Sequence, residues 1–365
     1  MEQVAAIRHA VLVLGHSRRW ASRTFRVARG TVDRYVDGAE PGKRKPAERP
    51  SPKRTETQAQ LEKLIGETAV AKKQQLTAQR AHELLRVLND PDVSAILPPW
   101  GGELASELLA LIDFEALRDL EPKWLLGHSD LSTLQMPLTL MTGWATAHGP
   151  NLMDLSPRQT DSLTLSALSV LAADFAQPVL QKSSTHYEEQ WPDYALQVDA
   201  PFNVTARTLW QQLDGASTSL SMRGHLIGGC LDTIALLAGS NYGDVPKFIR
   251  ESGAQGTILY FENAKLATGA LVRTLLSLRR HHWFDGLTGV LIGRSAGPRS
   301  KSPNALSYPD ALHAALDDLQ CPVIYDVDIG HRPPQFTLVN GAYAEVRFDG
   351  GAGSVEQSAN AQAFR

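Results

Sequence analysis

The sequence predicts an α/β protein with parallel strands, and three observations point to this fold class. Short apolar runs of strand length alternate with stretches in which apolar residues recur at the i, i+3, i+4, i+7 spacing of helices. Strands that alternate with helices in this way usually pair in parallel. Several of the apolar runs end in loops rich in Gly, His, Ser or Asp. With 365 residues, 43% of them hydrophobic and 21% charged, the chain is long enough for two domains with buried cores.

The composition excludes several classes of protein. No apolar run approaches the roughly 20 residues that span a bilayer, and no early segment has the pattern of a secretion signal. Two cysteines, Cys230 and Cys321, are too few for a disulfide framework or a four-cysteine zinc site. We therefore expect a cytoplasmic protein with no membrane partner. The net charge of −3 argues against nucleic acid as the main partner.

The first 56 residues differ from the rest of the chain. Residues 1–55 contain thirteen Lys and Arg but only five Asp and Glu. Basic arms are typical of proteins that bind nucleic acid or anionic surfaces. Here the lack of clean periodicity instead favours a poorly ordered extension, or a segment translated in an altered frame. Residues 10–15 are compatible with one short strand, and the proline-rich residues 41–52 predict a linker.

The predicted N-terminal α/β domain covers residues 57–155. Helix formers dominate residues 57–88, and a short strand is expected at 93–97. A helix at 103–111 follows, then strands at 123–127 and 145–150. Functional groups in such sheets lie on the loops at the carboxyl ends of strands. We therefore expect the loops after these three strands to form part of a site.

A second α/β pattern begins at residue 223, after a connector at 156–222. The connector contains a helix near 163–175 and an aromatic stretch at 186–194. The predicted C-terminal domain, residues 223–350, opens with a glycine turn at 228–229. Its helices are expected at 231–237 and 271–278, and its strands at 257–261, 289–293, 322–327, 335–339 and 343–348. Residues 351–365 are expected to form a flexible tail.

Three loops carry residues with catalytic chemistry. Ser129 lies in a Gly-His-Ser-Asp turn after a strand, a partial match to a nucleophile elbow, although Ser and Asp also cap helices. Glu262 ends a buried strand, where a carboxylate either caps a helix or orients a cationic group. His331 follows Gly330 and precedes two prolines, on a turn that suits a general base. Each motif is weak alone, but together they supply a nucleophile, an orienting carboxylate and a base at strand ends.

These motifs resemble the serine LD-carboxypeptidases, a family that includes the microcin C immunity peptidases. The resemblance covers about residues 80–350 and rests on DPDVSAILPPWGGE, PKWLLGHSDLSTL and TGWATAHGPNL, and on GTILYFENAK and YDVDIGHRPPQFTLVNGAYAEV. It implies a Rossmann-like N-terminal α/β domain and a smaller C-terminal α/β domain with a barrel-like sheet. It also implies an active site between the two domains and a homodimer.

The resemblance assigns roles to these residues. It implies a triad of Ser129, Glu262 and His331, and an oxyanion hole of backbone N–H groups from Asp130 and from Gly102 or Gly101. The implied reaction hydrolyses the amide between diaminopimelate and terminal D-Ala of murein tetrapeptides during cell-wall recycling, through an acyl-enzyme. No metal or cofactor is implied.

Two other hypotheses stay open. One is an immunity-type amidase that cleaves peptidyl or aminoacyl nucleotides, because the aromatic connector with Trp191 could stack on a base or could simply pack. The other is an impaired relative that only binds peptide, because residues 1–56 depart from the family pattern. His128, Cys230 and Asn263 also replace residues that are common in the family. The candidate substrate contacts are Trp100, His128, Trp191 and Arg332.

Overall fold

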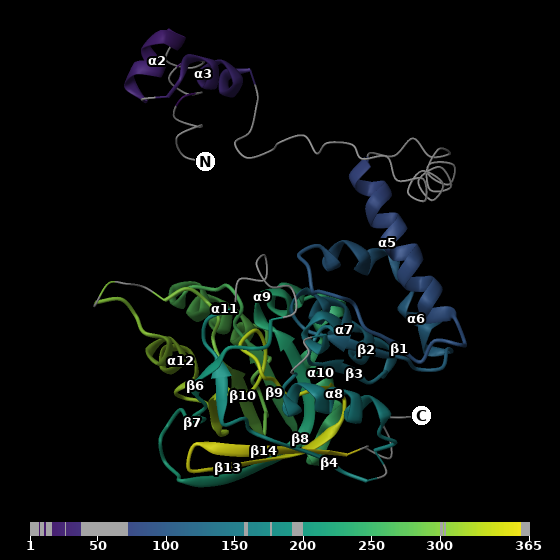
Figure 1. Ribbon diagram of the computed structural model, residues 1–365. Coiled ribbons are helices and arrows are strands. Elements are labelled where there is room, and N and C mark those ends of the chain that lie inside the picture. Colours follow the sequence, from purple (N-terminus) through teal and green to yellow (C-terminus); the bar gives the residue numbers. More distant parts are fainter. Residues whose placement is uncertain are drawn as a thin grey trace. The chain divides into compact units, whose positions relative to one another are not determined.

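The computed structural model describes residues 7, 11, 17–25, 27–37, 72–156, 160–175, 177–191, 200–299, 302 and 304–358 (Figure 1). The chain divides into two compact units, Met1–Val70 and Ala71–Arg365. The helices among the described residues are all too short or too polar to cross a membrane.

The first unit contains two short helices with a core of their own. Helix α2 spans Arg18–Thr24 and helix α3 spans Arg29–Val36. Ile7, Ala21 and Val32 are fully buried between them. Residues 18–24 and 29–36 are therefore helical, although the composition placed them in a poorly ordered extension. Apart from Val11, the strand expected at 10–15 and the linker at 41–52 lie outside the described residues.

The second unit contains a small sheet in its N-terminal half. Its strand order is β1-β2-β3-β12, where β1 is Ala95–Ile96, β2 is Trp124–Gly127, β3 is Thr146–His148 and β12 is Leu338–Asn340. The first three strands are parallel, and β12 pairs antiparallel with β3. These are the three strands expected from the first half of the sequence, in shorter form. Because β12 follows His331 in the chain, the C-terminal half of the sequence completes the N-terminal sheet.

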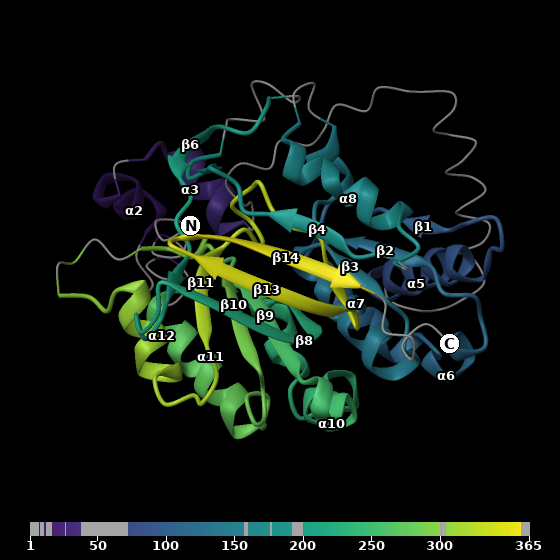
Figure 2. The same cartoon turned by 90° about the horizontal axis from the view of Figure 1, so that it is seen from below.

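The larger sheet has eight strands in the order β4-β14-β13-β8-β9-β10-β11-β7. Strands β8, β9, β10 and β11 are parallel, and the outer strands pair antiparallel. Their bounds are β4 Val179–Lys182, β7 Gln211–Gln212, β8 Ser219–Cys230, β9 Thr257–Glu262, β10 Gly289–Gly293, β11 Val323–Val327, β13 Tyr343–Asp349 and β14 Ala352–Ser358. Figure 2 shows the long β13–β14 hairpin beside β8. A separate hairpin pairs β5 (His186–Glu188) with β6 (Val204–Arg207).

Helices pack against both sheets. The α-helices of the second unit are α5 Lys72–Asn89, α6 Phe114–Arg118, α7 Ser132–Pro137, α8 Ser162–Ala172, α9 Leu231–Ile234, α10 Val245–Ser252, α11 Thr268–Arg280 and α12 Tyr308–Leu316. Shorter helical turns include η2 (Ala105–Leu111), η3 (Ser129–Leu131) and η5 (Leu152–Leu155). The helix expected at 103–111 is thus a 3-10 helix.

The central strands are buried on both faces. Along β9, Leu259 and Phe261 pack into the core that includes α11 and α12, whereas Ile258 and Tyr260 pack into the core around Phe336. Successive side chains of a strand point to opposite faces, so one apolar run supplies two cores. This burial explains why the central strands appear in the sequence as continuous apolar runs. The α/β fold class with parallel strands is confirmed.

Three details differ from the expectations. Residues 352–358, expected in a flexible tail, form β14, in which Val355 and Gln357 are buried. The connector at 156–222 supplies β4 and β7, the edge strands of the large sheet. Gly228 and Gly229 lie inside the 12-residue strand β8 and do not form a turn.

Candidate active site

The parallel strands of the large sheet bring polar groups to one edge. Strand β8 ends at Cys230 and β9 ends at Glu262, and these two residues are directly paired in register. The loop after β11 leads from Asp328 to His331 at the same edge. Two of the three triad candidates are therefore neighbours in space.

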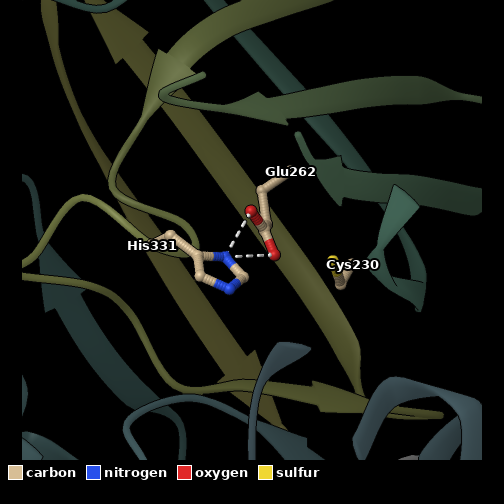
Figure 3. Close-up of side chains that lie close together, drawn as sticks. All are labelled: Cys230, Glu262 and His331. Carbon is tan, nitrogen blue, oxygen red and sulfur yellow. Dashed lines mark hydrogen bonds and ion pairs between the residues drawn. The ribbon is translucent and has the colours of Figure 1, made fainter. Parts of the chain in front are cut away.

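Glu262 and His331 form a hydrogen-bonded pair (Figure 3). His331 Nδ1 lies 3.0 Å from Glu262 Oε1 and 2.9 Å from Oε2. The carboxylate is fully buried, and the imidazole is mostly buried. Gly330 has φ +88°, and a Cβ there would lie 2.2 Å from Glu262 Cγ, so only glycine allows this close approach.

The Glu262 carboxylate and the His331 imidazolium each stabilise the charged form of the other. Burial raises the pKa of Glu262, but attraction to His331 outweighs it and lowers the pKa to about 2. Burial lowers the pKa of His331, and the attraction of the Glu262 carboxylate reverses this, so the pKa lies above its ordinary value of 6.5. Glu262 is therefore ionised at neutral pH. Its contact with Nδ1 leaves Nε2 as the ring nitrogen of His331 that Glu262 does not engage.

A second buried ion pair holds the His331 loop. Arg294 and Asp328 are both almost completely buried and are bonded to each other. Arg294 Nη1 also donates to the carbonyl oxygens of Arg332, at 2.9 Å, and Pro334, at 3.1 Å, on either side of the turn. Trp210 Nε1 donates to the other Asp328 oxygen at 2.7 Å. This network anchors the segment that carries His331.

Ser129 lies at the carboxyl end of the small sheet, two residues after β2 ends. It is half-buried and has φ +65°, a left-handed conformation that is costly for a residue with a side chain. Such a strained turn between a strand and a helix is the geometry of a nucleophile elbow. The partial sequence match therefore corresponds to a genuine elbow in the backbone.

The loop after β1 lies against this elbow. A Cβ on Gly101 would lie 2.6 Å from Ser129 Cβ, so the glycine is needed for the contact. Asp130 Oδ2 accepts a hydrogen bond from Ala105 N at 2.8 Å and fastens this loop. Among the described residues, the N–H groups of Gly101 and Gly102 have no hydrogen-bond acceptor. Together with the N–H of Asp130 at the start of η3, they are available to an oxyanion.

Ser129 and His331 line one cavity of about 420 Å³, a size that suits a small ligand. Within the part of the chain that the structure describes, the Ser129 hydroxyl and His331 Nε2 form no hydrogen bond with each other or with another group. In unliganded enzymes such bonds are often long and shorten only when substrate is bound. The structure thus brings all three triad candidates to one site, with the Glu–His bond formed.

Of the expected substrate contacts, three line this cavity. Trp100 and Trp191 are exposed there, and Trp191 Nε1 donates to the His331 carbonyl at 3.1 Å. His128 is buried, its ring lies 4.8 Å from that of His331, and burial lowers its pKa. Arg332 points elsewhere: its Nε donates to Ser295 O at 2.7 Å, and it lines a neighbouring cavity.

Several lining residues were not expected from the sequence. They are Asn151, Met153, Asp154, Glu188, Phe202, Pro333 and Gln335. Glu188 is buried, and its Oε1 has no partner among the described residues, while Asn203 N donates to Oε2 at 2.6 Å. Burial raises the pKa of Glu188. Asp154 and Glu188 give this wall two carboxyl groups, and the described lining contains no Lys or Arg.

Cys230, Glu262 and His331 are also close enough to be considered as metal ligands (Figure 3). Their ligand atoms lie within 4.8 Å of one another. Burial raises the pKa of the Cys230 thiol well above its ordinary value. Both Glu262 oxygens already face His331 Nδ1. The cluster therefore fits an orienting pair better than a metal centre.

Two segments of the chain match models of a known protein family. Residues 46–149 match the model of the LD-carboxypeptidase N-terminal domain, and residues 223–346 match that of the LD-carboxypeptidase C-terminal domain. The microcin C7 self-immunity protein of Escherichia coli is 25% identical over 275 residues, which cover 74% of this chain and 76% of that protein. A putative carboxypeptidase of Vibrio cholerae is 26% identical over 276 residues, which cover 74% of this chain and 77% of that protein.

Solved structures share the fold. The muramoyltetrapeptide carboxypeptidase from Oxalobacter formigenes has a TM-score of 0.58 at 21% identity. The superposition covers 78% of this chain and 85% of that protein. The microcin C7 self-immunity protein in complex with glutamyl sulfamoyl guanosine has a TM-score of 0.64 at 21% identity, covering 78% and 81%. At these identities the likeness concerns the fold.

Proposed function

Since the chain belongs to the LD-carboxypeptidase family, we propose that it hydrolyses a peptide amide next to a free carboxylate through Ser129, Glu262 and His331. The family confirms the prediction of a carboxypeptidase-type enzyme. The observation that carries the assignment of these residues is the buried Glu262–His331 hydrogen bond in the cavity that Ser129 also lines.

In this mechanism His331 is the general base. Its Nδ1 is held by Glu262, so Nε2 accepts the Ser129 proton as Oγ attacks the amide carbonyl. The developing negative charge on the carbonyl oxygen is stabilised by the N–H groups of Asp130 and Gly102 or Gly101. His331 then gives the proton to the leaving amine, and a water molecule releases the acyl group by the same steps in reverse.

The leading substrate is the murein tetrapeptide, cleaved between diaminopimelate and terminal D-Ala. The muramoyltetrapeptide carboxypeptidase that shares the fold supports this choice. The carboxyl groups of Asp154 and Glu188 add a second argument, because they suit the ammonium group of a diaminopimelate side chain. We further propose that the enzyme is a cytoplasmic homodimer and acts in cell-wall recycling.

A second candidate substrate is an aminoacyl or peptidyl nucleotide. The specific observation in its favour is the pair of exposed tryptophans, Trp100 and Trp191, in the wall of the cavity. Bases stack on such side chains. The relatives named for microcin immunity, with structures bound to sulfamoyl nucleosides, support the same choice.

The two candidates are separated by assaying both substrates with the same preparation. We expect D-Ala release from the L-Ala-γ-D-Glu-diaminopimelate-D-Ala tetrapeptide to exceed cleavage of a glutamyl sulfamoyl adenosine. Faster cleavage of the nucleotide would instead identify the protein as an immunity-type amidase. Binding of tetrapeptide without turnover, in a protein folded by circular dichroism, would identify an impaired relative.

A further inference from the structure

The helices α2 and α3 of the first unit form a helix pair of a recognisable kind. Helix α2 ends at Thr24 and α3 begins at Arg29, so four residues connect them. Figure 1 shows the two helices packed together in the purple segment. Two helices joined by a turn of three or four residues are the frame of the helix-turn-helix motif, which presents its second helix to DNA.

The two helices are held together by contacts of their own. Ala21 of α2 and Val32 of α3 are fully buried with Ile7. Ser17 caps α2, its Oγ accepting from Trp20 N at 3.1 Å. Ser22 Oγ donates to Val27 O at 2.7 Å and ties the turn to α2. A small core fixed in this way keeps the orientation of α3 constant, as recognition of a groove requires.

The charge of this unit suits a polyanion. Residues 17–37 contain six arginines and two aspartates. Arg18 engages both acidic residues, with distances of 3.2 Å to Asp33 Oδ1 and 2.8 Å to Asp37 Oδ1. The other arginines whose side chains the structure describes are Arg19, Arg23 and Arg29, which are exposed and have no ion-pair partner among the described residues. These three guanidinium groups are available to phosphates.

The start of α3 is exposed and carries no acidic side chain of its own. Its first turn has no acidic residue, and its N-cap, Ala28, provides no side-chain hydrogen bond. Ala28, Arg29 and Gly30 are exposed, and a Cβ on Gly30 would meet nothing within 4 Å. The packing of the described residues therefore does not require glycine here, yet a glycine inside a helix is unfavourable. Small residues at this point allow a close approach by another molecule.

From these observations we propose that residues 17–37 are a helix-turn-helix module that binds duplex DNA. Helix α3 enters the major groove with Arg29 at its leading end, and Arg19 and Arg23 of α2 contact the phosphate backbone. This function goes beyond the proposed hydrolysis, because the family matches begin at residue 46. It also revises the exclusion of nucleic acid, since the net charge of −3 averages a basic segment with an acidic remainder.

The test measures binding of the full-length protein to a fluorescent 30-base-pair DNA duplex by anisotropy, between 50 and 200 mM salt. We expect binding that weakens steeply as salt rises. Arg23→Ala combined with Arg29→Ala should weaken it roughly tenfold or more at 0.1 M salt and make the salt slope shallower by about one unit for each lost phosphate contact. Arg250→Ala, which removes an exposed arginine of the second unit, is the matched control and should bind like the parent protein.

A second pair of variants tests the groove contact. Gly30→Glu places bulk and negative charge on the open face of α3 and should abolish binding, whereas Gly30→Ala should fold and retain it. Circular dichroism checks that all variants keep their helices. The proposal is overturned if the parent protein does not bind the duplex at 50 mM salt, or if the double arginine variant binds equally well. It is also overturned if duplex RNA or phosphatidylserine vesicles bind more tightly than duplex DNA.

Discussion

The loop that carries Ser129 and the loop that carries His331 are held in place in different ways. The Ser129 elbow depends on backbone shape, with φ +65° at Ser129 itself and a glycine, Gly101, packed directly against it. The His331 turn depends on buried charge, because Glu262 and the Arg294–Asp328 pair are almost completely inaccessible to solvent.

This difference predicts different consequences of substitution. Changes beside Ser129 should alter the position of the nucleophile and the oxyanion donors, and so lower kcat without moving its pH dependence. Changes beside His331 should alter its pKa or leave an uncompensated charge in the interior. The pH profile and the free energy of unfolding therefore distinguish the two sides of the site.

The largest effect on the His331 side is expected for Glu262→Gln. Loss of the orienting carboxylate should lower kcat/KM by about 10³- to 10⁴-fold. His331 acts as a base only when neutral, so in the parent protein kcat/KM should fall as pH drops through its raised pKa, above 6.5. Without the Glu262 charge this pKa falls, and the acid limb of the profile moves to lower pH. The measurement is kcat/KM from pH 5 to 9, with the exposed Glu251→Gln as control.

One result of the Glu262→Gln experiment would contradict this prediction. An acid limb that stays in place in Glu262→Gln would show that the limb does not report on His331.

Arg294→Met should mainly destabilise the fold. It leaves Asp328 buried without its partner, which costs about 3–5 kcal/mol of unfolding free energy. The matched control is Arg279→Met, whose side chain is 30% exposed and pairs with the 69% exposed Asp318, a contact worth less than about 1 kcal/mol. Urea unfolding measures both. Equal losses in the two variants would refute the anchoring role of Arg294.

Gly101→Ala should lower activity with little effect on folding of the rest of the molecule. The new Cβ would lie 2.6 Å from Ser129 Cβ, so the loop must shift and the oxyanion donors with it. We expect a decrease in kcat of about 10²-fold. Gly269→Ala in α11, where a Cβ meets only an arginine tip at 3.8 Å, should retain full activity. An unchanged kcat in Gly101→Ala would argue against the role of this loop.

The smallest effect is expected for Trp191→Ala, and it depends on the substrate. If a base stacks on Trp191, the KM for an aminoacyl nucleotide should rise about 5- to 150-fold, since stacking contributes roughly 1–3 kcal/mol. The KM for the murein tetrapeptide should change much less. Trp191→Phe keeps a ring and is the conservative control. Equal effects on both substrates would show that Trp191 acts only by holding the His331 turn.

Much of the second unit could be predicted from the sequence, because its central strands are buried on both faces. Such strands appear as short apolar runs, as in residues 257–262 and 289–293. The triad candidates follow from the same logic, since Glu262 ends a strand and Ser129 and His331 lie on loops that follow strands.

The remaining elements depend on contacts that local patterns do not encode. Strand β14 is polar in sequence, and only its antiparallel pairing with β13 and β4 reveals it. A Cβ on Gly228 would lie 1.8 Å from the Tyr260 carbonyl oxygen, so this glycine permits close strand packing and does not form a turn. Arg294 has no local motif, because its partners lie 34 and more residues away. The helices of the first unit were not predicted, because the many arginines on their exposed faces made the segment resemble a disordered basic arm.

The most direct test of the account is the rate of D-Ala release from the murein tetrapeptide by the parent protein and by Ser129→Ala. Ser252→Ala, which removes a hydroxyl that lines a different cavity, is the control. We expect that release requires Ser129 and is unaffected in the control, while Ser129→Ala still binds the tetrapeptide. Undiminished release by Ser129→Ala would contradict it.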